Sequence, residues 1–145
     1  MRFLVDTNVF LHAANSASTF HDPARRFFEQ HLRLRTPWCF TWPIVYEFLR
    51  VATHSRVFPK PLKASQALAF IGHFLEIEEV AILAPTDRHF ALLNQVAGEL
   101  VQPAGNLFHD LHTATLMREH GVREIITADT DFLQFRFLTV TNPLQ

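Results

Sequence analysis

Short apolar runs alternate along the chain with longer stretches in which apolar residues recur every three or four positions. A short apolar run is typical of a buried strand, and the longer period is typical of a helix with one buried face. The runs predict strands at 3–5, 38–41, 80–84, 124–127 and 138–140. The periodic stretches predict helices from about Val9, at 23–34, from Pro43 to at least Ala52, at 63–75, at 85–100 and at 107–120.

Strands that alternate with helices predict an α/β fold, in which helices cover both faces of a central parallel sheet of four to five strands. Residues at the segment ends support these boundaries. Asp22 is placed to cap a helix that has Pro23 in its first turn, and Thr41 is placed to cap the helix that carries Pro43. Gly121 is placed to end the helix at 107–120.

Acidic residues recur where the predicted strands end. Asp6 directly follows the first strand, and Asp129 and Asp131 follow the fourth. Glu47 and Asp110 lie in the early turns of helices, and helical side chains lean back toward the helix N-terminus. Because ligands of an open parallel sheet gather at the carboxyl ends of its strands, we expect these carboxylates to meet at one edge.

Two of these acids occupy helix positions at which the hydrophobic periodicity predicts a buried apolar residue. Asp110 shares a helix face with Leu107 and Met117, and Glu47 shares one with Ile44 and Val51. Clustered, partly buried carboxylates repel one another, and they either take up protons or bind a cation. Mg²⁺ or Mn²⁺ is the ion that such oxygen ligands favour. The sequence therefore predicts a metal-dependent hydrolase that uses bound water.

Each acid also has a purely structural interpretation. An aspartate after a strand commonly caps the following helix, and Asp131 can cap a turn around Phe132. Glu47 can pair with Arg50 on the next helical turn. The joint placement of the acids at one edge is what favours the metal site.

Composition narrows the classes of protein to which the chain can belong. With 145 residues, 48% hydrophobic and 19% charged, the chain suits one globular domain. No stretch is long and apolar enough for a membrane span, and Asp6 interrupts any signal peptide, so we expect a cytoplasmic protein without a membrane partner. A single cysteine, Cys39, excludes an internal disulfide and a cysteine-based zinc site, and its apolar neighbours indicate a buried structural thiol.

The order and spacing of these motifs resemble the PIN domain family over nearly the whole chain, so 1–145 is expected to be a single PIN domain. The resemblance rests on four features in order: Asp6-Thr7-Asn8-Val9 after the first strand, Glu47, Asp110, and the stretch 127–132, Thr-Ala-Asp-Thr-Asp-Phe. It is greatest to the stand-alone bacterial PIN proteins that act as VapC toxins. The closing Thr141-Asn142-Pro143 resembles one VapC subgroup.

The resemblance implies a three-layer α/β/α fold and an endoribonuclease that uses Mg²⁺ or Mn²⁺ to activate water against an RNA phosphodiester. By the same resemblance, Asp6, Glu47, Asp110 and Asp129 would hold the metal, with Asp131 as a supporting or second-metal ligand.

The resemblance also implies positioning residues and partners. Asn8 and Thr127 would orient the carboxylates through hydrogen bonds. Apart from the resemblance, His12, which follows Asp6 by a turn or two, and Arg50 are candidates for contacts to the substrate phosphate. The implied partners are an RNA of the tRNA or rRNA class, a second copy of the chain in a homodimer, and a cognate VapB-type antitoxin. Most of the 15 phenylalanines are expected in the core, and exposed ones would serve a dimer seam or an antitoxin groove.

Three other classes fit less well. A haloacid-dehalogenase-like phosphatase needs a second acid where Asn8 stands, and a receiver domain needs paired acids after the first strand and a lysine after the last strand. A non-catalytic RNA-binding or protein-docking module on the same fold is the alternative from a different class. This alternative leaves unexplained why a protein that binds the polyanion RNA would place four carboxylates at the sheet edge where ligands bind.

Overall fold

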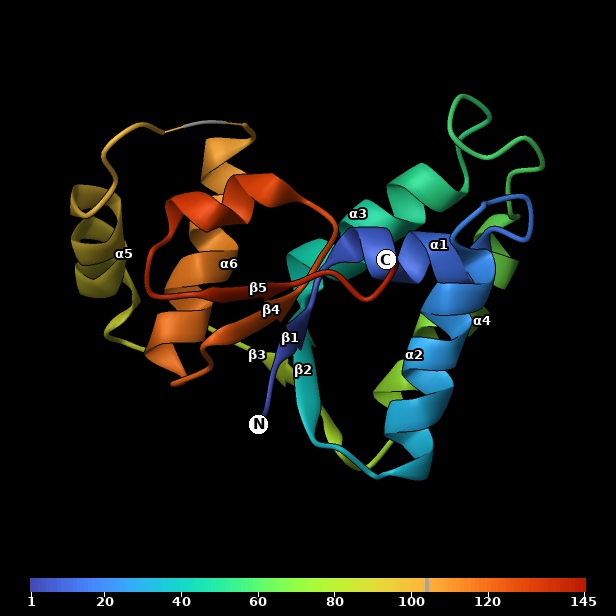
Figure 1. The fold of residues 1–145 in the computed structure, drawn as a ribbon, viewed down its shortest axis with the longest axis horizontal. Helices are drawn as coiled ribbons and strands as arrows, with labels where there is room; N and C mark the ends of the chain where they lie inside the picture. Colours follow the sequence, from blue (N-terminus) through green and yellow to red (C-terminus); the bar gives the residue numbers. More distant parts are fainter. Residues whose placement is uncertain (104) are drawn as a thin grey trace.

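The computed structural model describes residues 1–103 and 105–145, which form the predicted α/β architecture (Figure 1). In chain order the elements are β1 (Leu4–Val5), α1 (Thr7–Ala14), α2 (His21–Arg33), β2 (Trp38–Thr41), α3 (Trp42–Ala52), α4 (Ala64–Leu75), β3 (Val80–Leu83), α5 (His89–Gly98), α6 (Leu107–Glu119), β4 (Glu124–Ile126), the 3₁₀ helix η1 (Thr130–Gln134) and β5 (Thr139–Thr141).

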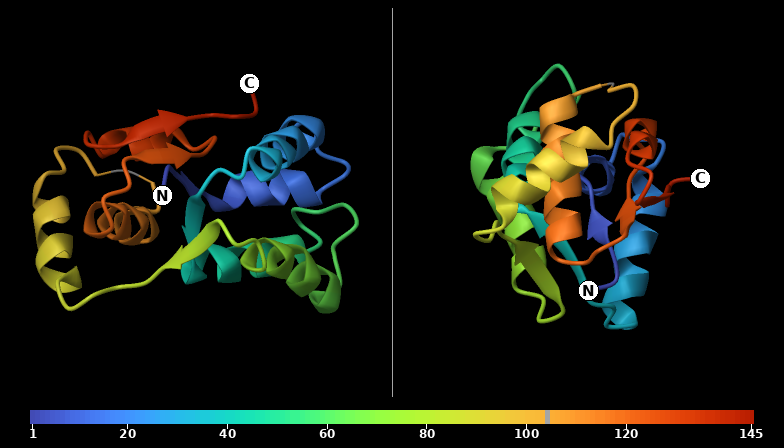
Figure 2. Two further views of the ribbon diagram at one scale, coloured as in Figure 1. Left: turned by 90° about the horizontal axis from the view of Figure 1, so that it is seen from below. Right: turned by 90° about the vertical axis from the view of Figure 1, so that its left-hand side faces the viewer.

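Within the described residues, five strands form one parallel sheet in the order β3-β2-β1-β4-β5. Helices α5 and α6 lie on one side of it, and α1, α2 and α4 lie on the other (Figures 1 and 2). The predicted three-layer α/β/α fold is therefore confirmed. No helix in the described part of the chain is both long and apolar enough to span a bilayer.

The N-terminal strand lies in the middle of the sheet, where it joins distant parts of the sequence. Leu4 pairs with Cys39 on one side and with Ile125 on the other. The pairing continues past the end of β1, because the Asp6 amide donates to the Ile126 carbonyl at 3.0 Å. Asp6 is thereby placed beside the end of β4, at the carboxyl edge of the sheet.

The helix boundaries follow local hydrogen bonds. The Thr41 side chain accepts a hydrogen bond from the Ile44 amide and caps α3, as predicted. Gly121 has φ +72° just after α6, which confirms its predicted role. Asp22 was wrongly predicted as a cap: the helix begins earlier, with Phe20 at the cap position, because Ser18 already turns the backbone by accepting from the amides of Phe20 and His21.

Helix α5 begins at His89, later than the sequence predicts, because the preceding residues bind Glu119 at the far end of α6. The Glu119 carboxylate is buried and accepts hydrogen bonds from the amide and hydroxyl of Thr86 and from His89 Nδ1. Burial acts to raise the pKa of Glu119, but the hydrogen bonds from Thr86 and His89 outweigh it and lower that pKa to about 2. This network holds α5 against the helix that carries Asp110.

The core is rich in aromatic rings, as expected from the phenylalanine content. Phe10, Trp38, Phe40 and Phe74 are buried and pack with ring centroids 5.1 to 6.0 Å apart. Cys39 is also fully buried, and burial raises the pKa of its thiol to about 12. The expectation of a structural thiol is therefore confirmed.

Candidate metal centre

Three of the five predicted acids converge at the carboxyl edge of the sheet. One carboxylate oxygen from each of Asp110, Asp129 and Asp131 lies within 4.8 Å of the other two. Asp110 is only 2% exposed, and within the described residues its buried Oδ2 has no hydrogen-bond partner. Buried polar oxygens are normally paired, so an orphaned carboxylate oxygen beside two further carboxylates fits a divalent cation with oxygen ligands.

Local structure aims these side chains at one another. Asp110 lies in the first turns of α6, as predicted, so its side chain leans toward the sheet edge. Asp129 caps η1, and its Oδ1 accepts from the Asp131 amide at 2.9 Å. The Asp129 amide in turn donates to Thr127 Oγ1 at 3.0 Å. These bonds turn the chain sharply after β4, which brings both aspartates to Asp110.

Asp6 lies beside this trio and is held by several hydrogen bonds. Its Oδ1 accepts from the Thr7 amide at 2.8 Å, and its Oδ2 accepts from Thr127 Oγ1 at 2.8 Å and from Asn8 Nδ2 at 3.1 Å. Asn8 also fixes the segment after β4, because its Oδ1 accepts from the Ala128 amide at 3.0 Å. Asn8 and Thr127 thus contact Asp6 in the way that their predicted positioning role requires.

The acids raise one another's proton affinity. Burial, and then the charges of Asp129, Asp6 and Asp131, raise the pKa of Asp110 to about 7. Burial also raises the pKa of Asp6, although hydrogen bonds from Thr127 and Thr7 and the nearby His109 partly oppose this. The edge therefore concentrates negative charge that a cation would neutralise.

The remaining predicted residues lie outside the trio. Glu47 lies on α3 with both carboxylate oxygens bound to Arg50, at 3.2 Å to Nε and 2.7 Å to Nη2. His12 lies in the last turn of α1, and its Nδ1 hydrogen-bonds Ser18 Oγ at 2.7 Å. The sequence predicts Asp131 as a supporting or second-metal ligand, and its carboxylate belongs to the same close group as those of Asp110 and Asp129.

Gly105 is a site residue that the sequence reasoning missed. It has φ +69°, and a Cβ atom at this position would overlap Asp131 Oδ2 and lie 2.7 Å from its Cγ. The backbone before α6 therefore lies directly against the Asp131 carboxylate. The sequence marked this stretch only as a break before a helix, although a glycine so close to Asp110 was a usable signal.

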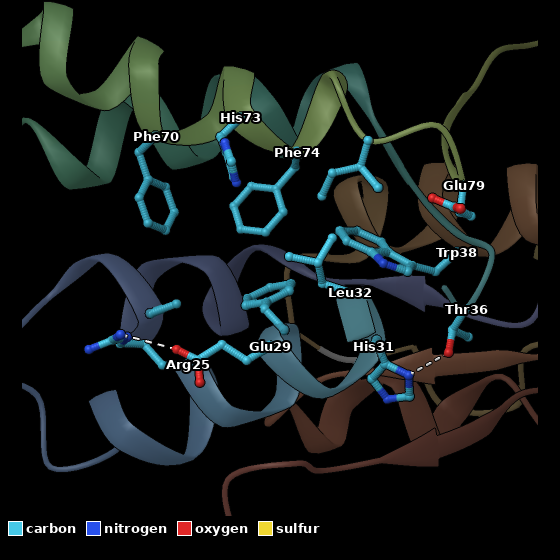
Figure 3. A pocket seen from close by; sticks show the side chains of 13 residues that line it. Arg25, Glu29, His31, Leu32, Thr36, Trp38, Phe70, His73, Phe74 and Glu79 are labelled. Carbon is cyan, nitrogen blue, oxygen red and sulfur yellow. Dashed lines mark hydrogen bonds and ion pairs between the residues drawn. The ribbon is translucent and has the colours of Figure 1, made fainter. Parts of the chain in front are cut away.

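A separate apolar groove of about 270 Å³ lies between α2 and α4 (Figure 3). Phe70 and Phe74 of α4 face Leu32 of α2 across it, with Trp38 at its inner end. Several of the charged and polar lining groups are paired: Arg25 with Glu29 at 3.0 Å, and His31 Nδ1 with Thr36 Oγ1 at 2.9 Å. The groove is thus suited to an apolar partner.

Comparisons with known proteins agree with the fold. The PIN domain family matches residues 3–138. Ribonuclease VapC48 of Mycobacterium tuberculosis is 33% identical over 138 residues, which cover 95% of this chain and 94% of the relative. Ribonuclease VapC37 of the same organism is 33% identical over 132 residues, with coverages of 91% and 90%.

Two solved structures share the fold. VapBC2 from Rickettsia felis, solved bound to a DNA fragment from its promoter, matches with a TM-score of 0.69 at 17% identity over 98% of both chains. The Mycobacterium tuberculosis toxin VapC20, which cleaves the sarcin–ricin loop, matches with a TM-score of 0.63 at 19% identity over 90% of this chain and 92% of that chain. The chain therefore belongs to the PIN domain family, and the relatives that it matches are VapC ribonucleases.

Proposed function

We propose that this protein is a Mg²⁺- or Mn²⁺-dependent endoribonuclease that acts as the toxin of a VapBC-type toxin–antitoxin pair. The observation that carries the proposal is the orphaned Oδ2 of Asp110, which is buried within the trio of Asp110, Asp129 and Asp131. The relatives named as VapC ribonucleases, which match over at least 90% of their length, support the same activity. Cleavage would be endonucleolytic hydrolysis of an RNA of the tRNA or rRNA class.

Each acid has a definite task in this proposal. Asp110, Asp129 and Asp131 hold the cation, and Asp6 and Glu47 complete the ligand set from the end of β1 and from α3. When bound, a divalent ion supplies Lewis acidity toward the phosphate and lowers the pKa of a bound water. Asn8 and Thr127 keep Asp6 oriented through the hydrogen bonds at its Oδ2, so that its carboxylate faces the centre.

Replacement of Asp129 by asparagine is the direct test. The amide would keep the shape of the side chain but remove one negative ligand, so we expect cleavage to fall by at least about 10²-fold. The assay is cleavage of labelled total tRNA and rRNA by antitoxin-free protein in Mg²⁺, Mn²⁺ or EDTA. Asp22→Asn on α2, where the acid is exposed, is the control and should cleave normally. Intact RNA in the Mg²⁺ and Mn²⁺ reactions as well, together with RNA binding that EDTA does not weaken, would instead favour a non-catalytic binding module.

Exposed aromatic side chains support a homodimer as the state of the free protein. Tyr46, Phe90 and Phe108 are 70%, 73% and 81% exposed, which is costly in water for rings of this size. Burial of such rings against a second copy would remove them from solvent. Light scattering during size-exclusion chromatography reports the mass, and a monomer would contradict this part of the proposal.

The apolar groove between α2 and α4 is proposed as the docking site of the VapB-type antitoxin. A groove lined by aromatic rings between two helices receives an amphipathic helix well, because the apolar face of that helix fills it. The pairing of Arg25 with Glu29 and of His31 with Thr36 leaves few lining charges that a partner would have to neutralise.

Leu32→Glu tests the groove. Leu32 lines it and is 51% exposed, so a charge there should weaken antitoxin binding by about tenfold or more while the protein stays folded. Leu68→Glu is the matched control, since this leucine of α4 is 55% exposed and does not line the groove. The affinity is measured by calorimetry with the cognate antitoxin. Equal affinities for the two variants would place the antitoxin elsewhere.

A further inference from the structure

One predicted metal ligand, Glu47, is already bound by a cationic side chain of the protein itself. Arg50, one helical turn later on α3, donates from Nε and Nη2 to the two oxygens of Glu47. This two-bond arrangement matches the fork of a guanidinium to the fork of a carboxylate. Among the ion pairs of the described residues, this is the one that engages a predicted metal ligand.

The pair is placed so that it can exchange partners. The Arg50 side chain is 67% exposed and that of Glu47 is 37% exposed, so water competes for both groups. In an exposed ion pair of this kind, the attraction changes the equilibrium constant between the paired and the separated side chains by only about fivefold or less. The carboxylate can therefore leave the guanidinium at small cost when a stronger partner is available.

We propose that Arg50 is a latch that couples RNA binding to metal binding. In the free protein Arg50 holds Glu47 outside the group formed by Asp110, Asp129 and Asp131. An RNA phosphate at the sheet edge takes over the guanidinium, and Glu47 is then released to join the metal centre. This inference rests on the proposed function and adds the order of events at the same site.

The chemistry of arginine supports this exchange. A guanidinium donates two parallel hydrogen bonds to a phosphate as readily as to a carboxylate, whereas an ammonium group offers only a point charge. The geometry of α3 brings the two candidate partners together, because the helix begins directly after β2 at the edge that carries the acids. The Arg50 guanidinium can therefore form its pair of parallel hydrogen bonds with Glu47 or with a bound phosphate, but not with both at once.

The latch predicts effects of opposite sign on the two ligands. Arg50→Met frees Glu47, so it should tighten binding of Mn²⁺ by about two- to fivefold. The same change removes a phosphate contact, so it should raise the KM for RNA by about tenfold. Arg50→Lys keeps the charge but loses the fork, so it should fall between the wild type and Arg50→Met in both measurements.

A double-mutant cycle separates the latch from simple charge effects. Calorimetry with Mn²⁺ alone is performed on the wild type, Arg50→Met, Glu47→Gln and the double variant. The tightening caused by Arg50→Met should vanish in the Glu47→Gln background. If Arg50→Met tightens Mn²⁺ binding equally in the wild-type and Glu47→Gln backgrounds, or in neither of them, the proposed latch is wrong. Arg35→Met is the control, because Arg35 is 71% exposed and paired with Glu78 and Glu79, and it should leave Mn²⁺ affinity unchanged.

The same calorimetry distinguishes failure of the latch from failure of the proposed function. If Asp110→Asn binds Mn²⁺ as tightly as the wild type, the acid trio is not the metal site and the proposed function fails. If Asp110→Asn loses Mn²⁺ but the cycle shows no coupling between Arg50 and Glu47, the metal centre stands and the latch alone is wrong.

Discussion

Asparagine in place of Asp110 is expected to stabilise the folded protein at pH 8 in EDTA by about 2 to 4 kcal/mol, and to abolish RNA cleavage. The pKa of this carboxyl is about 7 in the fold against 3.8 for an unperturbed aspartate, with burial as the main cause. Between these two values the folded state holds a proton that the unfolded chain has lost. Stability contributed by Asp110 is therefore complete below about pH 4 and is lost as pH rises through 7.

Urea unfolding at pH 5 and pH 8 measures this effect. The wild type should be clearly less stable at pH 8 than at pH 5, and Asp110→Asn should show a smaller difference, with a remainder from Asp6. Saturating Mn²⁺ should stabilise the wild type and leave Asp110→Asn almost unaffected, because an ion that binds only the folded state shifts unfolding by mass action. An Asp110→Asn variant that is less stable than the wild type at pH 8 would contradict this account.

Gly105→Ala is expected to disable the proposed metal centre although it replaces none of the carboxylates. The left-handed backbone, with φ +69°, costs a non-glycine residue about 1 kcal/mol or more. In addition, the new methyl group would overlap Asp131 Oδ2, so the carboxylate must turn away. We expect Mn²⁺ affinity to fall by about 10- to 100-fold, a loss typical of a disturbed ligand position.

Gly121→Ala supplies the matched control for this substitution. Gly121 has a similar backbone, with φ +72°, but a Cβ atom there would meet nothing within 4 Å. Both variants should lose comparable stability in thermal unfolding, and only Gly105→Ala should lose Mn²⁺ binding and cleavage. Equal Mn²⁺ affinities in the two variants would mean that Asp131 is not a ligand.

The sheet and its carboxyl edge could be predicted from the sequence because each depends on local signals. Apolar runs predicted β1 to β5, and the Thr41 cap with Pro43 predicted the start of α3. Asp6, Asp110 and Asp129 follow strands or begin helices, so their position at the edge follows from topology alone. The Asp22 cap was wrong because Ser18, four residues earlier, turns the chain before Asp22 is reached.

The finer geometry of the site could not be predicted, because it depends on which side chains meet in space. The trio contains Asp131 because Asp129 binds the Asp131 amide and turns the chain into η1. Glu47 lies outside the trio, and both of its carboxylate oxygens bind Arg50 on the same helix. The contact between Gly105 and Asp131 joins two segments, and the hydrophobic periodicity of the sequence does not predict how these segments lie relative to each other.

The central place of β1 also determines when, during synthesis of the chain, the sheet and its acid edge can form. Leu4 and Val5 are synthesised more than a hundred residues before their partners Ile125 and Ile126, and the Thr127 hydroxyl that holds Asp6 follows those partners. Contacts of such long sequence separation form late in folding, since the intervening chain must first be closed into a loop. A nascent chain that ends before β4 therefore lacks both a neighbour of its central strand and two of its three clustered acids. The acid edge can therefore form only after the segment that carries β4 and η1 has been synthesised.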